Sequence, residues 1–259
     1  MNPLLRAQIA SIARRQIVRT LRQPASAIPP ILFPLALMLV NAGGLDSATS
    51  LPGFPADSFY AFALAVPFIQ GALFSTVNAG TDLARDIQNG FLNRLALTPM
   101  RGVALLAGLL AGVVALGVAQ AVVYVVAGLA VGVDIQSGAA GVAVLLLLSA
   151  LISLGFGALG AMMALRTGSG EAVQGLFPAL FVFLFISSMN MPRNLIEIEW
   201  FRIAATVNPV SYLIEGVRSL VITGWDGETL ALAFGIAFAL AVIALGLAAH
   251  ALGGRMERT

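Results

Sequence analysis

The stretch 81–101, TDLARDIQNGFLNRLALTPMR, is a polar island between two long apolar segments. Within it, apolar side chains recur at every fourth position, at Leu83, Ile87, Phe91 and Leu95. This spacing predicts an amphipathic helix. Thr81 or Asp82 is the expected N-cap, Gly90 weakens the middle, and Pro99 stops the helix near residues 96–98.

Such a helix is expected to lie along a membrane surface. Its polar face carries arginine, aspartate and amide side chains and therefore suits a protein partner in water. Two simpler interpretations stay open: a solvated loop that joins two spans, and an interfacial helix without any partner.

The composition places this island in a membrane protein. Of the 259 residues, 59% are hydrophobic and 10% are charged, whereas soluble proteins average about a quarter charged residues. The sequence has no cysteine, which excludes disulfides and thiolate metal sites. Its one histidine, His250, makes a histidine metal site improbable.

The apolar segments predict six transmembrane helices, because a span needs about 20 residues. They are residues 25–40, 58–80, 103–131, 139–165, 175–191 and 230–252. The first is short and contains three prolines, so a kink is expected. Six glycines of the third and fourth segments permit close helix contact, and packing is favoured over a pore: Gly108, Gly112, Gly117, Gly155, Gly157 and Gly160.

The N-terminal residues 1–23 predict a second amphipathic helix. Four arginines share one arc of the helix, with apolar side chains opposite: Arg14, Arg15, Arg19 and Arg22. An interfacial helix with its guanidinium groups among anionic headgroups fits this pattern. A plain topology anchor that supplies positive charge fits it equally.

The arginines predict the topology. With both termini in the cytoplasm, eleven of the fourteen arginines lie inside, and three lie outside, at Arg193, Arg202 and Arg218. This asymmetry obeys the positive-inside rule. The island at 81–101 then faces the cytoplasm.

Residues 192–229 are too apolar for a free outer loop, so short re-entrant helices are expected there. Asn208 and Pro209 break the segment, Ser211 is a predicted cap, and Glu215 is spaced to pair with Arg218. A gating role and a plain exoplasmic cap are both compatible with this pattern.

Two motifs, LARDIQNGFLNRLALTPMRGVALLAG and NPVSYLIEGVRSL, together with the order of the segments, resemble the membrane permeases of ABC-2 type transporters, particularly the daunorubicin-resistance, drug-export branch. The resemblance covers the full length as one domain, with the type V exporter-like fold. It implies that residues 82–101 form the coupling helix for an ATP-binding subunit and that the N-terminal helix touches the same subunit. The residues implied in this coupling are Arg14, Arg15, Arg85, Asp86, Gly90, Arg94, Pro99 and Arg101.

The resemblance further implies a multi-pass permease in the plasma membrane of a prokaryote, with a second permease copy and two ATPase subunits. These subunits would bind ATP and Mg²⁺, and this chain itself would have no cofactor and no enzymatic activity. The outer motif of the family maps to Asn208, Pro209, Tyr212, Glu215 and Arg218. Efflux of a hydrophobic or amphipathic compound, as in antibiotic resistance, is the implied function, and nucleic acid is not an expected partner.

The residues themselves agree with this mechanism. No G-x-x-x-x-G-K-[ST] motif is present, so the energy must come from another chain. The span interiors lack ionisable residues, which argues against proton or sodium coupling. Candidate route-lining side chains, for which plain packing is the alternative, are Gln70, Asn78, Phe177, Phe181, Phe185 and Asn190.

Three alternatives stay open. Ser169 and His250 would both lie near the cytoplasmic side, which allows an intramembrane serine protease. A stand-alone channel or scaffold would need no ATPase, but the mixed-charge island weighs against it. An ABC exporter of polysaccharide or lipid-linked glycan is the closest rival, although the spans contain phenylalanine and few hydroxyl groups.

Overall fold

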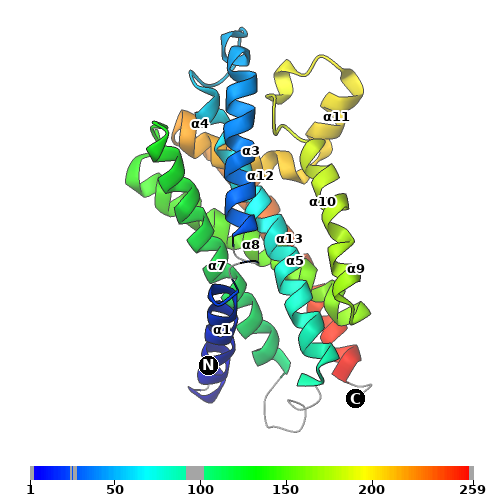
Figure 1. Cartoon of the computed structure of the whole chain (residues 1–259). Helices are drawn as coiled ribbons and strands as arrows, with labels where there is room; N and C mark the ends of the chain where they lie inside the picture. Colours follow the sequence, from blue (N-terminus) through cyan, green and yellow to red (C-terminus); the bar gives the residue numbers. More distant parts are fainter. Residues whose placement is uncertain (1–2, 24, 26–27, 92–101, 257–259) are drawn as a thin grey trace.

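The computed structural model describes residues 3–23, 25, 28–91 and 102–256, and within these residues the regular structure is helical, with no strand. The helices form an elongated bundle whose longest members run along one axis (Figure 1). Five described helical segments are long and apolar enough to span a membrane. The predicted all-α, polytopic fold class is therefore confirmed.

Four long helices make up the centre of the bundle: α5 (Ala65–Gln88), α7 (Gly102–Ala130), α8 (Gly138–Thr167) and α13 (Gly227–Met256). Helices α7 and α8 agree with the predicted third and fourth spans within two residues at each end. Helix α13 extends beyond the predicted 230–252 at both ends. These segments were predictable because their apolar runs exceed the length of one span.

Helix α5 is buried along most of its length and crosses α8 closely. A Cβ at Gly160 would overlap the carbonyl oxygen of Thr76, and one at Gly80 would lie 2.5 Å from Val173. The backbones can approach this closely only because neither glycine carries a side chain. Gly160 therefore has the predicted packing role, because its lack of a side chain lets α8 contact α5.

The island 81–91 does not begin a separate helix, and the predicted N-cap at Thr81 or Asp82 is wrong. Residues 81–88 form the last turns of α5, and the Thr81 hydroxyl donates to the carbonyl oxygen of Val77 within that helix. Leu83 and Ala84 continue its buried face. The helix ends at Gln88, and Gly90 follows with φ +66°, a left-handed conformation common just after helix ends. Residues 92–101 lie outside the described part.

The fifth span lies nearer the N-terminus in the structure than the predicted 175–191. It consists of α9 (Gly170–Gln174) and α10 (Leu176–Phe185), and residues 186–191 are not helical. Two carbonyl groups at the end of α10 accept hydrogen bonds from Asn208 instead of from the next helical turn. The apolar segment Gly170–Phe185 is shorter than the five full-length candidates.

The first and second spans also differ from their predicted bounds. Helix α3 covers Pro29–Leu45, later than the predicted 25–40, and continues into η1 (Asp46–Ser50). The second span begins as a short helix, α4 (Phe59–Ala63), which Ser58 caps by accepting from the N–H of Tyr60. Pro29 suits the start of α3 because the first helical turn needs no N–H donors.

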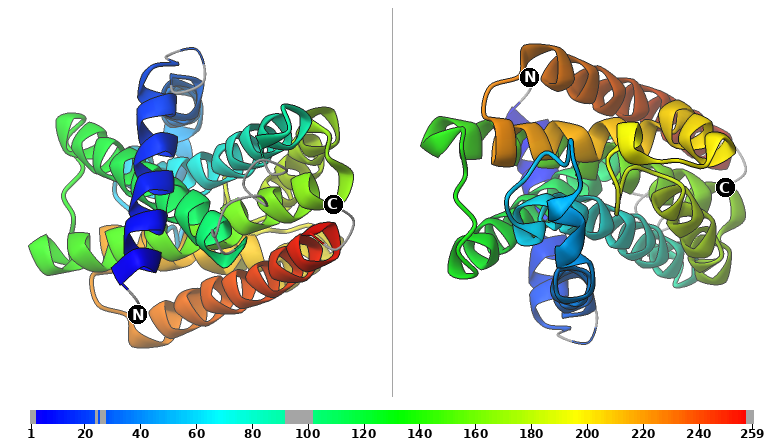
Figure 2. Two further views of the ribbon diagram at one scale, coloured as in Figure 1. Left: turned by 90° about the horizontal axis from the view of Figure 1, so that it is seen from below. Right: turned by 90° about the horizontal axis from the view of Figure 1, so that it is seen from above.

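Short helices lie across one end of the bundle, as expected for residues 192–229. They are η2 (Arg193–Leu195), α11 (Glu199–Val207), α12 (Pro209–Arg218) and η3 (Ser219–Thr223). The view from above shows α12 and η3 running across the long helices rather than along them (Figure 2). We call this the α11 end.

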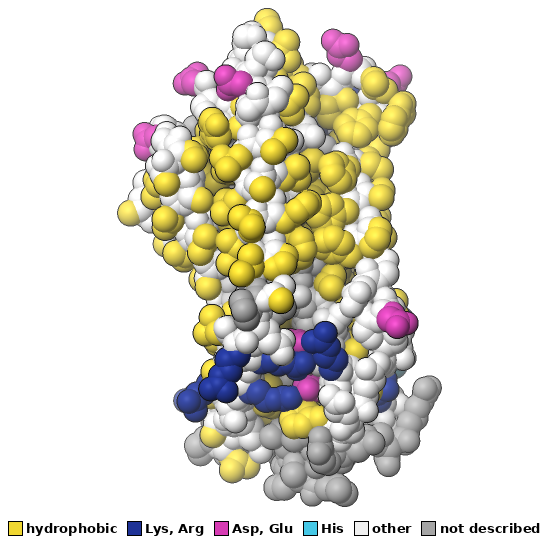
Figure 3. Space-filling view, in the orientation of Figure 1, with side chains coloured by type: hydrophobic (Ala, Val, Ile, Leu, Met, Phe, Trp, Pro, Cys, Tyr) yellow, Lys and Arg dark blue, Asp and Glu magenta, His cyan; other side chains and the backbone are white. Residues whose placement is uncertain are grey.

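The opposite end carries α1 (Pro3–Leu21) and the last turns of α13, so both terminal helices lie at the same end (Figures 1 and 2). Arginines gather at this end, most acidic side chains gather at the α11 end, and a broad hydrophobic band separates them (Figure 3). This distribution is typical of a protein whose middle lies in a bilayer. We call the α1 end the arginine-rich end.

Candidate functional site

Helix α1 is joined to the end of α5 by a charge cluster at the arginine-rich end, formed by Arg15, Arg19, Asp82 and Asp86. The Arg15 guanidinium donates to both carboxylate oxygens of Asp86, at 2.9 and 2.8 Å. Arg19 lies 3.1 Å from Asp82 and 3.5 Å from Asp86. Both aspartate side chains are largely shielded from solvent, which strengthens these ion pairs relative to fully exposed ones.

The same helix is seated on α7 by its apolar side. Cβ atoms added at Gly108 and Gly112 would lie 2.6 Å from Ile12 and 2.7 Å from Gln16. Gln16 is buried, and its amide donates to Asp82 at 2.8 Å. Helix α1 therefore bridges α5 and α7, and its position is defined by packing on one helix and by charge on the other.

The predicted coupling residues fall into three groups. Arg15 and Asp86 bind each other, so their charges are largely used within the chain. Arg14 and Arg85 are exposed, and among the described residues Arg85 forms one ion pair, with Asp82 at 3.8 Å. Gly90 ends α5, and the remaining three lie outside the described residues: Arg94, Pro99 and Arg101.

Sequence reasoning left Asp82 and Arg19 out of the candidate site, although a signal was present. Arg15 and Arg19 are four residues apart, as are Asp82 and Asp86. When two arginines on one helix and two aspartates on another are each four residues apart, both ion pairs can form at once where the helices meet. The separation of these residues in the sequence hid the match.

Asn208 organises the outer motif at the α11 end. Its carboxamide oxygen accepts from the N–H of Val210, which caps α12, and Pro209 occupies the first helical position. Its amide nitrogen donates to the carbonyl oxygens of Phe183 and Ile186, at 2.5 and 2.6 Å. Asn208 thus starts one helix and ends another.

The predicted cap at Ser211 is wrong, because Asn208 holds that role three residues earlier. Ser211 is buried inside α12, and its hydroxyl accepts from the N–H of Ser188. Tyr212, the next member of the motif, donates its hydroxyl to the carbonyl oxygen of Thr206 at 2.9 Å and so ties α12 back to α11.

Arg218 is buried without a carboxylate at ion-pair distance among the described residues. Its guanidinium donates to the carbonyl oxygens of Phe62, Ser188 and Met189, and it lies 3.4 Å from the centre of the Phe62 ring. Burial lowers the pKa of Arg218 to about 9, while the charge of Glu215 opposes this shift. The guanidinium therefore stays protonated at neutral pH and joins α12 to the start of the second span.

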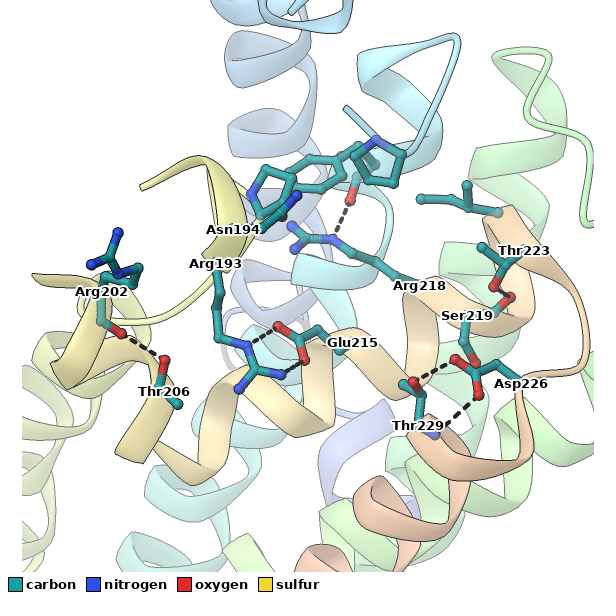
Figure 4. Close-up of a pocket in the computed structure, with 14 residues that line it drawn as sticks. Arg193, Asn194, Arg202, Thr206, Glu215, Arg218, Ser219, Thr223, Asp226 and Thr229 are labelled. Atoms are coloured by element: carbon teal, nitrogen blue, oxygen red, sulfur yellow. Dashed lines mark hydrogen bonds and ion pairs between the residues drawn. The ribbon is translucent and has the colours of Figure 1, made fainter. Parts of the chain in front are cut away.

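The predicted pair of Glu215 with Arg218 is wrong, because Glu215 binds Arg193. The Arg193 guanidinium donates to both carboxylate oxygens of Glu215, at 2.8 and 2.5 Å (Figure 4). It also stacks 4.5 Å above the Tyr212 ring. Desolvation acts to lower the pKa of Arg193, but the Glu215 carboxylate outweighs it and raises that pKa. A side chain brought from η2 offers better bidentate geometry than a neighbour in the same helix.

The predicted route residues do not form one lining. Phe177 and Phe181 pack together at 4.5 Å between ring centres and meet Phe74 of α5 and Phe33 of α3. Phe185 extends this row at the exposed surface. The row lies on the hydrophobic face formed by α3, α5 and α10 (Figure 3).

The three polar route candidates lie in different surroundings. Gln70 is fully buried, and neither atom of its amide group has a hydrogen-bond partner among the described residues. Asn78 lines a small cavity of about 140 Å³ between α1, α5 and α7. Asn190 accepts a hydrogen bond from Asn41 at 3.4 Å.

The serine protease alternative finds no support in the described residues. The Ser169 hydroxyl accepts from the N–H of Ala172 and caps α9. His250 is exposed on α13, and no hydrogen bond joins it to Ser169 in the part of the chain that the structure describes. A nucleophilic serine needs a base within hydrogen-bond reach.

The fold and these contacts define a class: a multi-pass helical membrane protein with a charge cluster at one end and short transverse helices at the other. The family profile described as ABC-2 type transporter matches residues 7–222. The chain belongs to this family.

Relatives of this chain point the same way. It is 28% identical over 207 residues to the daunorubicin resistance ABC transporter permease protein DrrB1 of Streptomyces coeruleorubidus, an alignment that covers 76% of this chain and 69% of that protein. It is 27% identical over 224 residues to Ycf38 of Porphyra purpurea, whose name describes it provisionally as a transport permease, with 85% and 76% of the two chains covered.

Proposed function

We propose that this chain is the membrane-spanning permease subunit of an ATP-driven exporter that moves a hydrophobic or amphipathic compound out of the cytoplasm or the inner leaflet. Drugs, natural products and lipids are compounds of this kind. Membership of the ABC-2 family supports the transport role, and the similarity to DrrB1 supports drug efflux over glycan export.

The observation that carries the proposal is the charge cluster between α1 and α5. Because α5 runs without interruption from this cluster into the centre of the bundle, a push on its end moves a rigid rod of 24 residues. Such a helix spans about 36 Å at 1.5 Å per residue. A partner that closes on ATP would then change the packing of α5 against α8, as alternating access requires.

The energy source in this proposal is a separate ATPase subunit, present in two copies, which binds ATP and Mg²⁺. Its docking surface includes the exposed Arg14 and Arg85 beside the charge cluster, together with residues 92–101. In this arrangement the arginine-rich end faces the cytoplasm of a prokaryotic cell.

A second permease copy would complete the transporter. The hydrophobic face of α3, α5 and α10 carries the phenylalanine row, and Phe185 at the end of this row is more than half exposed. An apolar face at membrane depth suits lipid, another copy of the chain, or an apolar cargo between two copies. It offers few of the polar groups that a glycan would need.

The decisive experiment is purification of the tagged chain from its native membrane, followed by a search for a co-purifying ATPase subunit. Arg14→Glu reverses a charge on the proposed docking surface, and Arg94→Glu does so in residues 92–101. Arg166→Glu is the matched control, because Arg166 is also an exposed arginine at the arginine-rich end.

We expect the wild type and the control to retain the ATPase and ATP-dependent export, and the two docking variants to lose both while remaining folded. A wild-type chain that stays alone and shows no ATP-dependent export would refute the proposal. Full export by a folded Arg14→Glu, Arg94→Glu double variant would refute the docking surface alone.

A further inference from the structure

A cavity of about 570 Å³ opens at the α11 end, between η2, α11, α12, η3 and the start of α13 (Figure 4). Its volume lies within the range of small-molecule sites, which is about 300 to 1,000 Å³. Neither the charge cluster nor the phenylalanine row contributes to its walls. The cavity is therefore separate from the transport machinery proposed above.

The walls contain three arginines and two acidic residues. Arg193 and Glu215 neutralise each other through their bidentate pair. Arg202 and Arg218 have no carboxylate at ion-pair distance among the described residues. With three arginines against two acids, the cavity walls carry a net positive charge.

The second acidic residue of the walls, Asp226, caps the start of α13. Its carboxylate accepts from the Thr229 hydroxyl at 2.6 Å and from the N–H of Glu228 at 3.1 Å, as a cap of α13. The Thr229 hydrogen bond holds the pKa of Asp226 below its usual range. Asp226 serves as this cap and, among the described residues, forms no ion pair with Arg202 or Arg218.

Hydrogen-bond donors remain available on the arginines. A guanidinium has five N–H groups, and Arg218 uses one from each of its three nitrogens on carbonyl oxygens. Arg202 is exposed at the cavity wall, and its guanidinium makes no hydrogen bond or ion pair with the described residues. The exposed amide of Asn194 lines the same wall.

Exposed aromatic and apolar side chains near the cavity indicate its level relative to the membrane. Trp200 and Trp225 are 65% and 58% exposed, and Ile203 and Val207 give α11 an exposed apolar face beside Arg202. Exposed tryptophans concentrate at the level of lipid headgroups. The abundant anion at that level is phosphate.

We propose that this cavity binds a phosphate group, held by Arg202 and Asn194 with the remaining N–H groups of Arg218. The guanidinium fork matches two phosphate oxygens, and hydrogen bonds between two charged groups are stronger than neutral ones. The phosphate belongs either to a lipid headgroup or to a small soluble phosphate ester. The proposal does not depend on the ATPase or on the cargo.

The test uses the full chain in a neutral maltoside detergent and follows its thermal midpoint during titration. The probes are dioctanoyl phosphatidic acid, glycerol 3-phosphate, and dioctanoyl glycerol as the control without phosphate. Arg202→Gln removes a wall charge at an exposed position. Arg166→Gln is the matched control at the opposite end, and Asn194→Ala is the second wall variant.

We expect phosphatidic acid to stabilise the chain and Arg202→Gln to raise its apparent Kd about tenfold, as for loss of one charge-assisted contact, with no change in Arg166→Gln. Asn194→Ala should raise it by a smaller factor. Equal binding of glycerol 3-phosphate, with the same Arg202 dependence, would support the site with a soluble ligand. Binding of dioctanoyl glycerol as tight as that of phosphatidic acid, or no effect of either wall variant, would overturn the proposal.

Discussion

At the scale of single residues, the polar side chains of the outer motif act as connectors between helices. Asn208 caps α12 and ends α10, and Arg218 reaches carbonyl groups of the second span and of the segment after α10. Each group is buried and hydrogen-bonded, so its loss leaves several backbone groups without partners. The contacts of the outer motif therefore hold neighbouring helices together.

Asn208→Ala is expected to lower the thermal midpoint by roughly 6 to 12 °C. The change removes a cap and two buried hydrogen bonds, together about 3 kcal/mol. Fluorescence-detected size exclusion after heating measures the midpoint in detergent. Asn194→Ala, at an exposed position, is the control and should melt with the wild type. Equal midpoints for both variants would contradict the connector role.

Arg218→Lys is expected to destabilise the chain by about 3 kcal/mol, although it keeps the charge. A lysine ammonium is a compact point charge and cannot replace the planar fork that reaches three carbonyl oxygens. The same thermal assay measures the effect. Arg202→Lys, at the exposed arginine nearby, should leave the midpoint unchanged, and a stable Arg218→Lys would show that charge alone suffices.

At the scale of elements, α1 is a bridge between α5 and α7 rather than a free surface helix. One side meets the glycines of α7, and the other carries the arginines of the charge cluster. A helix held on two sides follows the motion of both. Helix α1 is therefore positioned to move with the end of α5.

Exchange of the charges between Arg15 and Asp86 tests this bridge. Arg15→Asp and Asp86→Arg alone place like charges together and should reduce export at least tenfold. The double exchange should recover part of it, because the arginine placed at position 86 still faces Arg19. The pair itself contributes only about 1 kcal/mol, because Arg15 is 43% exposed. ATP-dependent export in vesicles is the measurement. Failure of the double exchange to improve on the single variants would indicate a separate role for each residue.

At the scale of the whole molecule, the separation of charges predicts the orientation in the membrane. The arginine-rich end should lie in the cytoplasm and the α11 end outside. Because the chain has no cysteine, single cysteines can report this directly. Ser50→Cys and Glu171→Cys place them at opposite ends, both at exposed positions.

A membrane-impermeant maleimide added to intact cells should label Ser50→Cys, and should label Glu171→Cys only after permeabilisation. The cysteine-free wild type is the control for background. The reverse pattern would invert the topology and place the charge cluster outside, where no ATPase could reach it.

Several features were predictable from sequence because they depend on local pattern. Helices α7 and α8 follow from uninterrupted apolar runs, and the break at Asn208 and Pro209 follows from their backbone preferences. The end of α5 was not predictable in this way. The polarity of residues 81–88 indicated a new helix, but the backbone hydrogen bonds of α5 continue through these residues. The apolar side chains of residues 81–88 pack against the long helices of the bundle, as the rest of α5 does.

The sequence by itself determined the fold class and the charge asymmetry, because composition and period act over neighbouring residues. Only the tertiary structure decided the partners: Arg15 with Asp86, Arg193 with Glu215, and Arg218 with three carbonyl oxygens. These contacts join residues from 22 to 156 positions apart. Such pairings depend on how helices pack, and helix packing is a property of the whole bundle rather than of any one segment.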